Sequence, residues 1–347
     1  MRALTIRGYG GLEQLELRDD VPMPDILAPT DVRIRVRAAA LNHIDLFVLQ
    51  GLPGSTIVAP WIVASDLCGV VDATGPAVTN VVPGDLVVVN PGMSDRICAY
   101  CEAGEHPLCL KYRILGEHAP GTAAEYVVVP APNVRAIPSH IDVHAAAAFS
   151  LATLTAWRML HTRARVRAGE RVLIVGIGGG VAIAALQICK QIGAEVWVTS
   201  RSAAKLERAR ALGADHLIDS TRQDVAAEIR SATRKAGVNV VVDSVGEATW
   251  QQSLLALGKA GRLVTCGGTS GPMVTTDVRR MFWNQWTMMG STMGNDEEYD
   301  AIIRELRIER LLPPVDAVFP LSDGRRAYER LMSAEQFGKV VIEVSRT

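Results

Sequence analysis

The chain has 347 residues, 48% of them hydrophobic, and its 36 Lys and Arg residues against 37 Asp and Glu residues give a net charge of −1. The length predicts two domains, and the balanced charge argues against nucleic acid and anionic membranes as partners. No apolar run approaches the roughly 18 residues of a membrane helix. The first residues predict a strand rather than a signal peptide. Cys68, Cys189 and Cys266 lie in apolar surroundings, as is typical of a reducing compartment. We therefore expect a cytoplasmic protein with a small-molecule substrate.

Residues 1–130 contain short alternating or β-branched runs separated by turns that carry Pro and Gly. After an initial strand at residues 1–6, the runs are Val32–Val36, Cys68–Ala73, Leu86–Val89 and Ala124–Val129. Residues 82–85 (Val-Pro-Gly-Asp) and 90–92 (Asn-Pro-Gly) are two of the turns. This pattern predicts a small β-barrel or a curled sheet.

A cluster of metal-ligand residues follows these strands, with the spacing D-x2-C-x2-C-x7-C. Its members are Asp95, Cys98, Cys101 and Cys109. Adjacent turns at this spacing bring thiolates within about 4 Å of one another, as a tetrahedral zinc ion requires. Zinc also accepts a carboxylate oxygen, so Asp95 is the candidate fourth ligand. The alternative is three ordinary loop cysteines without a metal.

The second half of the chain alternates strand and helix, after a segment of helical composition at residues 145–162. The expected strands are Arg171–Val175, Glu195–Thr199, His216–Ile218, Val238–Asp243 and Arg262–Cys266. The expected helices are Val181–Ile192, Ala203–Leu212, Ala226–Lys235 and Trp250–Leu257. Repeated βα units of this length predict a parallel, doubly wound sheet. A helix at Glu297–Glu309 and a strand at Lys339–Val344 complete the chain.

A glycine-rich turn joins the first of these strands to its helix. It contains Gly176, Gly178, Gly179 and Gly180, followed by Val181. Glycines at a strand-to-helix turn let the backbone approach a pyrophosphate, and the helix N-terminus presents free N–H groups to it. The spacing departs from strict G-x-G-x-x-G, because Val181 or Ala182 occupies the last position. We interpret the turn as a dinucleotide site, the alternative being a plain glycine loop.

The end of the second strand of this sheet predicts which dinucleotide binds. A site for NAD usually has a carboxylate there, which accepts hydrogen bonds from the ribose hydroxyls. This chain has Ser200 and Arg201, with Lys205 one helical turn further on. A hydroxyl and a guanidinium suit a 2′-phosphate, so we expect NADP(H). The alternative is that Arg201 and Lys205 are solvated surface residues.

Taken together, these motifs resemble the medium-chain dehydrogenase/reductase superfamily over essentially the whole length. Further matching stretches are residues 112–118, 124–128, 240–243, 290–294 and 337–341. The resemblance implies an α/β fold with two domains. Residues 1–152 and 295–347 would form a GroES-like β-barrel catalytic domain, and residues 153–294 a Rossmann domain. It also implies a homodimer that pairs edge strands.

The resemblance identifies the cysteine cluster as the lobe that holds a structural zinc in zinc-dependent members. Asp95 stands where the first of four cysteines would be. The ligands of their catalytic zinc match Asn42, Ser65 and Leu151, with Asp66 beside the second position. A carboxamide, a hydroxyl and an isobutyl group do not form a zinc site of useful strength. The hydroxyl that relays the alcohol proton matches Ile44. The resemblance thus implies one structural zinc and no catalytic zinc, as in the quinone and enoyl reductase branch.

Four residues are candidates for the chemistry itself. Asn42 is the leading candidate donor to an enolate oxygen, and its alternative is a cap on the local turn. His43 matches a position that contacts the cofactor pyrophosphate and is a candidate proton donor; a surface histidine is the alternative. Asp45 is expected to orient this loop through backbone hydrogen bonds. Thr153 and the cofactor candidate Thr155 are expected to reach the nicotinamide carboxamide or ribose. The alternative is that both threonines pack a helix.

The remaining cofactor candidates lie at strand ends or in the last strand. Asp243, Gly246, Cys266 and Gly267 end strands at the carboxyl edge of the sheet, where such sheets bind ligands. Lys339 resembles a family position near the cofactor phosphates, and its alternative is an exposed lysine.

The sequence therefore predicts an NADPH-dependent reductase of a quinone or of a double bond conjugated to a carbonyl. One alternative is an alcohol or aldehyde dehydrogenase with an atypical metal arrangement. Another is a nucleotide-binding protein without significant turnover. Trp61 and the indole-rich segment 281–289 are candidates to line an apolar substrate pocket. The alternative for the segment is that it packs a dimer interface. No motif in the loops near residues 50–60 and 270–295 identifies the substrate.

Overall fold

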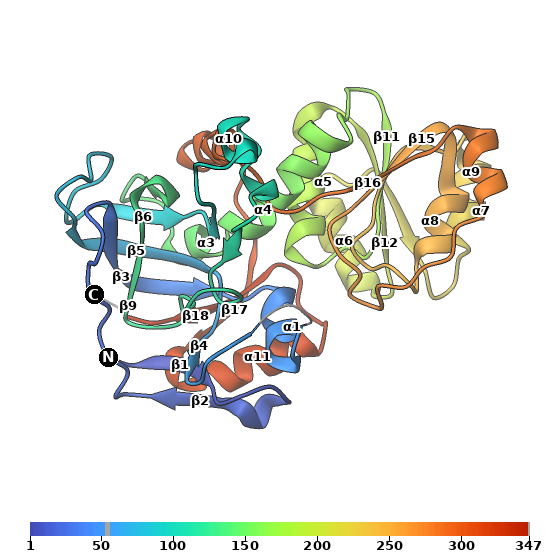
Figure 1. Cartoon of the computed structure of the whole chain (residues 1–347). Coiled ribbons are helices and arrows are strands. Elements are labelled where there is room, and N and C mark those ends of the chain that lie inside the picture. The colour runs from blue at the N-terminus through green and yellow to red at the C-terminus, as the bar shows by residue number, and fades with distance from the viewer. Residues whose placement is uncertain (53–55, 346–347) are drawn as a thin grey trace. The chain divides into compact units, whose positions relative to one another are not determined.

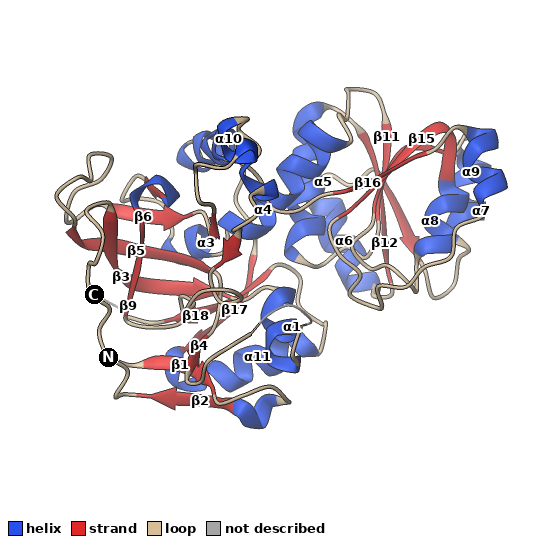
Figure 2. Cartoon of the chain, in the orientation of Figure 1, coloured by secondary structure: helices blue, strands red, loops and turns tan. Residues whose placement is uncertain are grey.

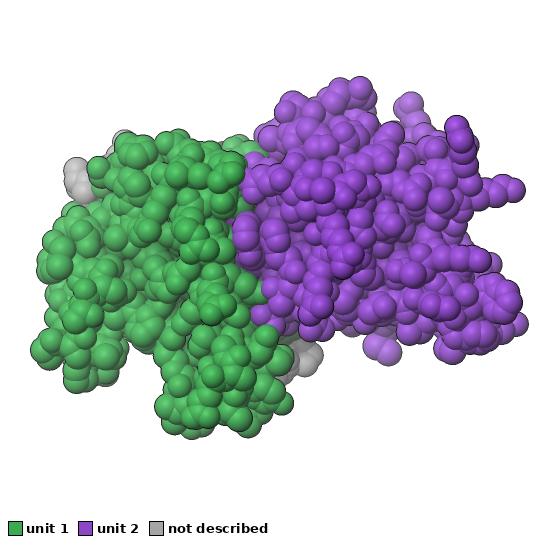
Figure 3. Space-filling model, turned by 90° about the horizontal axis from the view of Figure 1, so that it is seen from above, with its two compact units in different colours: residues 1–152, 294–347 green, residues 153–293 purple. Residues whose placement is uncertain are grey.

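The computed structural model describes residues 1–52 and 56–345. The chain forms two compact units, coloured separately in Figure 3. Unit 1 contains Met1–Ala152 and Gly294–Thr347, and unit 2 contains Thr153–Met293. Part of the loop near residues 50–60, namely residues 53–55, lies outside the described residues. No helix among the described residues is long and apolar enough to cross a membrane.

Unit 1 is built on a curled sheet of seven strands (Figure 1). The strand order is β10-β6-β5-β3-β18-β17, and β9 also pairs with β3. The strands are β3 (Asp31–Ala40), β5 (Asp66–Thr74), β6 (Leu86–Val89), β9 (Tyr126–Pro130), β10 (Val134–Ala136), β17 (Val315–Pro320) and β18 (Lys339–Glu343). Alternate residues of β3 are buried in the core of unit 1, as a sheet with one covered face requires.

The last strand of the chain lies beside one of the first, and this pairing places the candidate site. Strand β18 pairs antiparallel with the end of β3, with Val341 opposite Ala40. The start of β18 therefore reaches the residues that follow β3. Helix α1 (His43–Gln50) begins directly there, and α11 (Gly324–Met332) contacts it.

Smaller elements complete unit 1. They are β1 (Ala3–Ile6), β2 (Leu15–Arg18), β4 (Trp61–Ile62), β7 (Gly92–Met93), β8 (Arg113–Ile114), α2 (Ala99–Glu102), α3 (Val143–Ala147) and α10 (Asp296–Arg307). The segment of helical composition at residues 145–162 is helical, in separate parts. Helix α3 ends at Ala147, and α4 (Ser150–Trp157) begins after Phe149. The Phe149 side chain, between the two helices in sequence, is completely buried. A π-helical stretch, Arg158–Arg163, follows α4.

Unit 2 is the expected parallel, doubly wound sheet. Its strand order is β13-β12-β11-β14-β15-β16, and all neighbours are parallel. The strands are β11 (Arg171–Ile174), β12 (Glu195–Ser200), β13 (His216–Asp219), β14 (Val238–Val242), β15 (Leu257–Thr265) and β16 (Thr287–Gly290). Chain order reverses between β11 and β14, the position where such sheets bind ligands at their carboxyl edge.

Helices cover both faces of this sheet (Figure 2). One face carries α5 (Gly180–Ile192) and α6 (Ala203–Ala211). The other carries α7 (Val225–Ala232), α8 (Trp250–Ala256) and α9 (Val278–Asn284). Because both faces are covered, the central strands are mostly apolar; Val172, Leu173 and Ile174 of β11 are fully buried.

Candidate active site

The glycine turn after β11 has the backbone shape of a phosphate-binding turn. Gly176 and Gly178 have φ values of +72° and +136°, which side chains rarely adopt. A Cβ at Gly179 would meet nothing within 4 Å, so open space faces the turn. Helix α5 begins at Gly180, and Val181 follows in its first turn. Free N–H groups and the helix dipole at this end suit the pyrophosphate of a dinucleotide.

The end of β12 carries polar and basic side chains and no carboxylate. Ser200 is the last residue of the strand, and its Oγ accepts a hydrogen bond from the Ser202 N–H at 3.1 Å. Arg201 is exposed. Ser202 caps α6, and its Oγ accepts from the N–H of Lys205 at 3.4 Å. The N-terminus of α6 thus lies between the two basic residues in sequence, an arrangement that favours an anion.

Asp243 organises the turn after β14 and is completely buried. Its carboxylate accepts from the N–H groups of Val245 (2.8 Å) and Gly246 (3.0 Å). It also accepts from the hydroxyls of Thr249 (2.9 Å) and Ser253 (2.6 Å). Its observed role is therefore to shape this edge of the sheet, and direct contact with a cofactor stays a prediction.

The other unit 2 candidates differ in their exposure. Burial raises the pKa of the Cys266 thiol to about 12, so this sulfur stays protonated. A Cβ at Gly267 would meet nothing within 4 Å. On α4, Thr153 and Thr155 are buried, and the Thr155 hydroxyl contacts Met293 Sδ at 3.9 Å. Their cofactor contacts stay predictions.

Unit 1 contains a buried polar cluster centred on Asn42, which is 8% exposed. The Asn42 Nδ2 donates to Asp66 Oδ2 at 2.9 Å. The Lys339 ammonium donates to Asn42 Oδ1 and, at 3.0 Å, to Asp66 Oδ2. Asn42 does occupy the N-cap position of α1, as the alternative interpretation expected. Its carboxamide nevertheless binds a buried ion pair.

Asp66 links the three positions that match catalytic-zinc ligands. Its Oδ2 accepts from Asn42, and its Oδ1 accepts from the N–H of Leu151 at 2.8 Å. Ser65, the second position, precedes it, and the Ser65 hydroxyl is buried without a hydrogen-bond partner among the residues that the structure describes. The three positions therefore converge in space, which supports the register used to match them.

Lys339 is 3% exposed, so the alternative of an exposed lysine is wrong. Its charge is matched by Asp66, which is fully buried. Each of these buried charges stabilises the other, because the desolvation cost of an unpaired buried charge is not offset by any attraction. A direct contact between Lys339 and cofactor phosphates stays a prediction, since the described contacts of this ammonium lie within unit 1.

Asp45 orients the start of α1, as expected. Its Oδ2 accepts from the Asn42 N–H at 2.7 Å, and the Asp45 N–H donates to the Asn42 carbonyl oxygen at 3.0 Å. Burial raises the pKa of Asp45 to about 7. The carboxyl thus titrates near neutral pH, which no pattern in the sequence indicates. His43, the first residue of α1, is half-buried.

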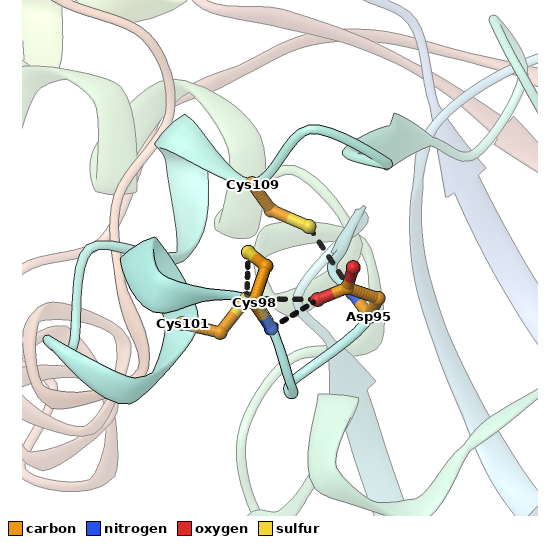
Figure 4. A group of neighbouring side chains, drawn as sticks. All are labelled: Asp95, Cys98, Cys101 and Cys109. Atoms are coloured by element: carbon orange, nitrogen blue, oxygen red, sulfur yellow. Dashed lines mark hydrogen bonds between the residues drawn. The ribbon is translucent and has the colours of Figure 1, made fainter.

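The cysteine cluster has the geometry of a four-ligand metal site (Figure 4). Ligand atoms of Asp95, Cys98, Cys101 and Cys109 all lie within 4.8 Å of one another. The Cys98 and Cys101 sulfurs are 3.5 Å apart, and Cys101 Sγ is 3.4 Å from Asp95 Oδ1. Zn–S bonds of about 2.3 Å in a tetrahedron place sulfurs roughly 3.7 Å apart. These residues therefore fit zinc.

Backbone N–H groups donate to the first and last ligands of the cluster, Asp95 and Cys109. Ile97 and Cys98 each donate to Asp95 Oδ1 at 3.1 Å, and these bonds hold the pKa of Asp95 well below its ordinary value. The N–H groups of Asp95 and Lys111 donate to Cys109 Sγ at 3.3 and 3.4 Å. The backbone of the lobe therefore holds both ligand atoms in place.

Comparison with known proteins gives the family. The model described as the alcohol dehydrogenase GroES-like domain matches residues 28–139, and that described as zinc-binding dehydrogenase matches residues 180–307. A crystal structure of an NAD-dependent alcohol dehydrogenase has a TM-score of 0.95 and 41% sequence identity, covering 99% of this chain and 100% of its own. This chain belongs to the medium-chain dehydrogenase/reductase superfamily. The resemblance and the expected fold are therefore confirmed.

Relatives within the superfamily differ in their named activities. The quinone oxidoreductase of Pseudomonas aeruginosa is 30% identical over 98% of this chain and 99% of its own length. The acryloyl-coenzyme A reductase of Metallosphaera sedula is 29% identical over 99% of both chains. Membership therefore establishes an oxidoreductase and leaves the substrate and the choice between NAD and NADP open.

Sequence reasoning missed the part that Asp66 and Lys339 play together. In the sequence Asp66 is only the neighbour of a lost ligand, and the resemblance assigns Lys339 to the cofactor. The two are 273 residues apart in sequence. The available signal was a charged residue at the start of each strand, Asp66 in β5 and Lys339 in β18, and that signal does not reveal that the two residues pair.

Proposed function

We propose that this protein is an NADPH-dependent reductase of quinones or of double bonds conjugated to a carbonyl. The observation that carries the proposal is the residue set at the matched zinc positions. A carboxamide, a hydroxyl and an isobutyl group stand there, joined through Asp66 to the buried ammonium of Lys339. Such a set offers hydrogen-bond donors and a fixed cation, and it offers few good zinc ligands.

These residues suit a reaction in which negative charge develops on an oxygen remote from the reacting carbon. Bound NADPH would supply the hydride, which adds to the carbon–carbon bond and leaves charge on the conjugated oxygen. The Asn42 carboxamide can donate a hydrogen bond to that oxygen. His43 is the candidate that returns a proton to the reduced substrate. One zinc ion held by the 95–109 cluster would stabilise that lobe and take no part in the chemistry.

The choice of NADPH is supported by the end of β12. Ser200 and Arg201 stand where a carboxylate would accept from the ribose hydroxyls of NAD, and the N-terminus of α6 follows. Arg201 is exposed and offers a planar set of donors that suits a phosphate.

Two relatives bear names that agree with this reaction type, a quinone oxidoreductase and an acryloyl-coenzyme A reductase. A second candidate function has its own support. The solved structure with 41% identity is an NAD-dependent alcohol dehydrogenase, so this chain is a candidate alcohol or aldehyde dehydrogenase with an atypical metal arrangement. The zinc content separates the two: about one ion per chain fits the reductase, and two ions fit the dehydrogenase.

The direct test is to follow NADPH oxidation with quinones, enones and enoyl thioesters, with NADH and with alcohol oxidation in parallel. We expect turnover with at least one of the three acceptor classes and none with simple alcohols. Alcohol oxidation together with two zinc ions per chain would overturn the proposal. Tight NADPH binding without turnover in any assay would instead identify a nucleotide-binding protein.

We also propose that the protein is a homodimer that uses the β16 edge of unit 2. Strand β16 ends the six-stranded sheet, and α9 beside it exposes Val278, Phe282 and Trp283. Trp286 does not belong to this surface. It is 7% exposed, packs in the core of unit 2 and donates to the Gly258 carbonyl at 2.9 Å. It is therefore a core residue of unit 2.

A further inference from the structure

We propose that Lys339 is a positioning residue that sets the orientation of the Asn42 carboxamide and strengthens it as a hydrogen-bond donor. The inference rests on the proposed function, in which Asn42 binds the developing oxyanion. It assigns to Lys339 a task distinct from contact with the cofactor.

The contacts of the carboxamide allow only one orientation. An ammonium can donate but cannot accept, so the atom that Lys339 meets is the Asn42 oxygen. An ionised carboxylate can accept but cannot donate, so the atom that meets Asp66 is the Asn42 nitrogen, at 2.9 Å. A flipped carboxamide would turn both contacts into clashes of like polarity. The ion pair therefore selects the orientation that presents N–H.

The Asn42 nitrogen carries two protons, and Asp66 accepts one of them. The second is the donor that the proposed reaction needs. An ammonium on the amide oxygen draws electron density away from the nitrogen, and hydrogen bonds in such a chain strengthen one another in a low-dielectric site. Because all three side chains are buried, water screens this effect little.

The arrangement also explains why Lys339 must be a cation. Asp66 is fully buried and already accepts from Asn42 and from the Leu151 N–H. Without Lys339 its charge would be uncompensated, and it would compete for the second Asn42 proton. Lys339 thus keeps that proton available as well as holding the oxygen.

The test is a double-mutant cycle with N42A, K339M and the double variant, assayed with the best acceptor from the screen. We expect K339M to lower kcat about tenfold or more and to change the KM for NADPH less than twofold. In the N42A background K339M should change kcat less than twofold, because the residue through which Lys339 acts is gone. The proposal would be overturned if K339M changed only the KM for NADPH. It would also be overturned if K339M lowered kcat by the same factor in the N42A background as in the wild type.

Since K339M leaves the Asp66 charge unpaired, D66N/K339M serves as a second variant that removes both charges. The carboxamide introduced by D66N has one oxygen where Asp66 uses two, so it keeps the hydrogen bond from the Asn42 nitrogen only by losing the one from the Leu151 N–H. Thermal unfolding of this variant is therefore measured beside kcat to show that it is folded. We expect its kcat to be as low as that of K339M. A kcat equal to that of the wild type would contradict a role for the ammonium.

An NMR measurement that does not depend on turnover separates this inference from the proposed function. In ¹⁵N-asparagine-labelled protein, K339M should shift the side-chain amide signals of Asn42. The signals of Asn133 should not move; this buried carboxamide donates to the Asn90 and Gly92 carbonyls. Unmoved Asn42 signals would refute the positioning role even in an active reductase. Shifted signals in a protein without reductase activity would leave only the proposed function wrong.

Discussion

Asp45 is a carboxyl group whose environment favours its neutral form. It is 3% exposed, and burial raises its pKa from an ordinary value of 3.8 to about 7. The unfolded chain has released this proton above about pH 4, while the folded chain keeps it until about pH 7. Folding therefore takes up as much as about one proton here, and this group makes the protein less stable as pH rises from 4 to 7.

We expect D45N to flatten this part of the pH–stability profile, because the amide keeps an acceptor for the Asn42 N–H and cannot ionise. Urea unfolding at pH 5, 6, 7 and 8 measures the free energy of unfolding for both proteins. Relative to D45N, wild type should lose stability towards pH 7 and little more above it. D85N, which alters a half-buried turn carboxyl that accepts from Val82, should run parallel to wild type. If the free energies of unfolding of D45N and wild type differed by the same amount at every pH, the explanation would be refuted.

Arg201 decides the cofactor if our interpretation of the end of β12 is correct. We expect R201A to raise the KM for NADPH about tenfold and to leave the KM for NADH within twofold, since NADH has no 2′-phosphate. Steady-state kinetics with both nucleotides measure this. R210A is the matched control, because Arg210 lies in α6, the helix that follows Arg201, and pairs with Glu207 at 3.3 Å. Equal effects of R201A on both nucleotides would contradict the interpretation.

At the scale of elements, strands and helices were both predictable where the local sequence pattern is strong, and helices α5, α6 and α8 agree with their expected bounds to within a residue. The strand Leu86–Val89 has the bounds that its sequence predicts, and most unit 2 strands agree to within a residue. Helices α1 and α11 were missed. In α11 the run of Arg and Glu hides a buried face of Ala327, Tyr328 and Leu331, which packs in the core of unit 1. A helix that depends on tertiary burial of a few residues has a weak local signal.

The 95–109 lobe has little regular structure, so its stability should depend on its metal. We expect about one zinc per chain by mass spectrometry. C109S should lose it and lower the melting temperature, because three remaining ligands bind zinc more weakly. K111A should retain zinc, since Lys111 contributes only a backbone N–H. Full zinc retention in C109S would exclude this residue as a ligand.

The identity of the fourth ligand can be tested separately. D95C places a thiolate in the position of Asp95, and zinc prefers sulfur over oxygen. We expect D95C to lose zinc to a chelator about tenfold more slowly than wild type. Unchanged release would mean that Asp95 does not bind the metal.

At the scale of the whole molecule, the exposed apolar surface on α9 is the feature that the monomer leaves unexplained. Phe282 and Trp283 are 65% and 76% exposed. We expect W283E to shift the protein from dimer to monomer in sedimentation velocity, without loss of thermal stability in unit 2. L27E is the control, because Leu27 is 88% exposed in unit 1 and its substitution should leave the oligomeric state unchanged. A wild-type monomer would refute the proposal, as would a W283E dimer.

The amino-acid sequence was enough to establish the family, the barrel and the doubly wound sheet, the glycine turn and the metal-ligand cluster. Each of these depends on residues close together in the chain, where spacing and periodicity act directly. The contact of Lys339 with Asn42 and Asp66 is visible only in the folded chain. That contact forms because β18 pairs with β3 across almost the whole chain. The raised pKa of Asp45 is likewise a property of the fold, since desolvation depends on what surrounds a residue and local sequence does not contain that information.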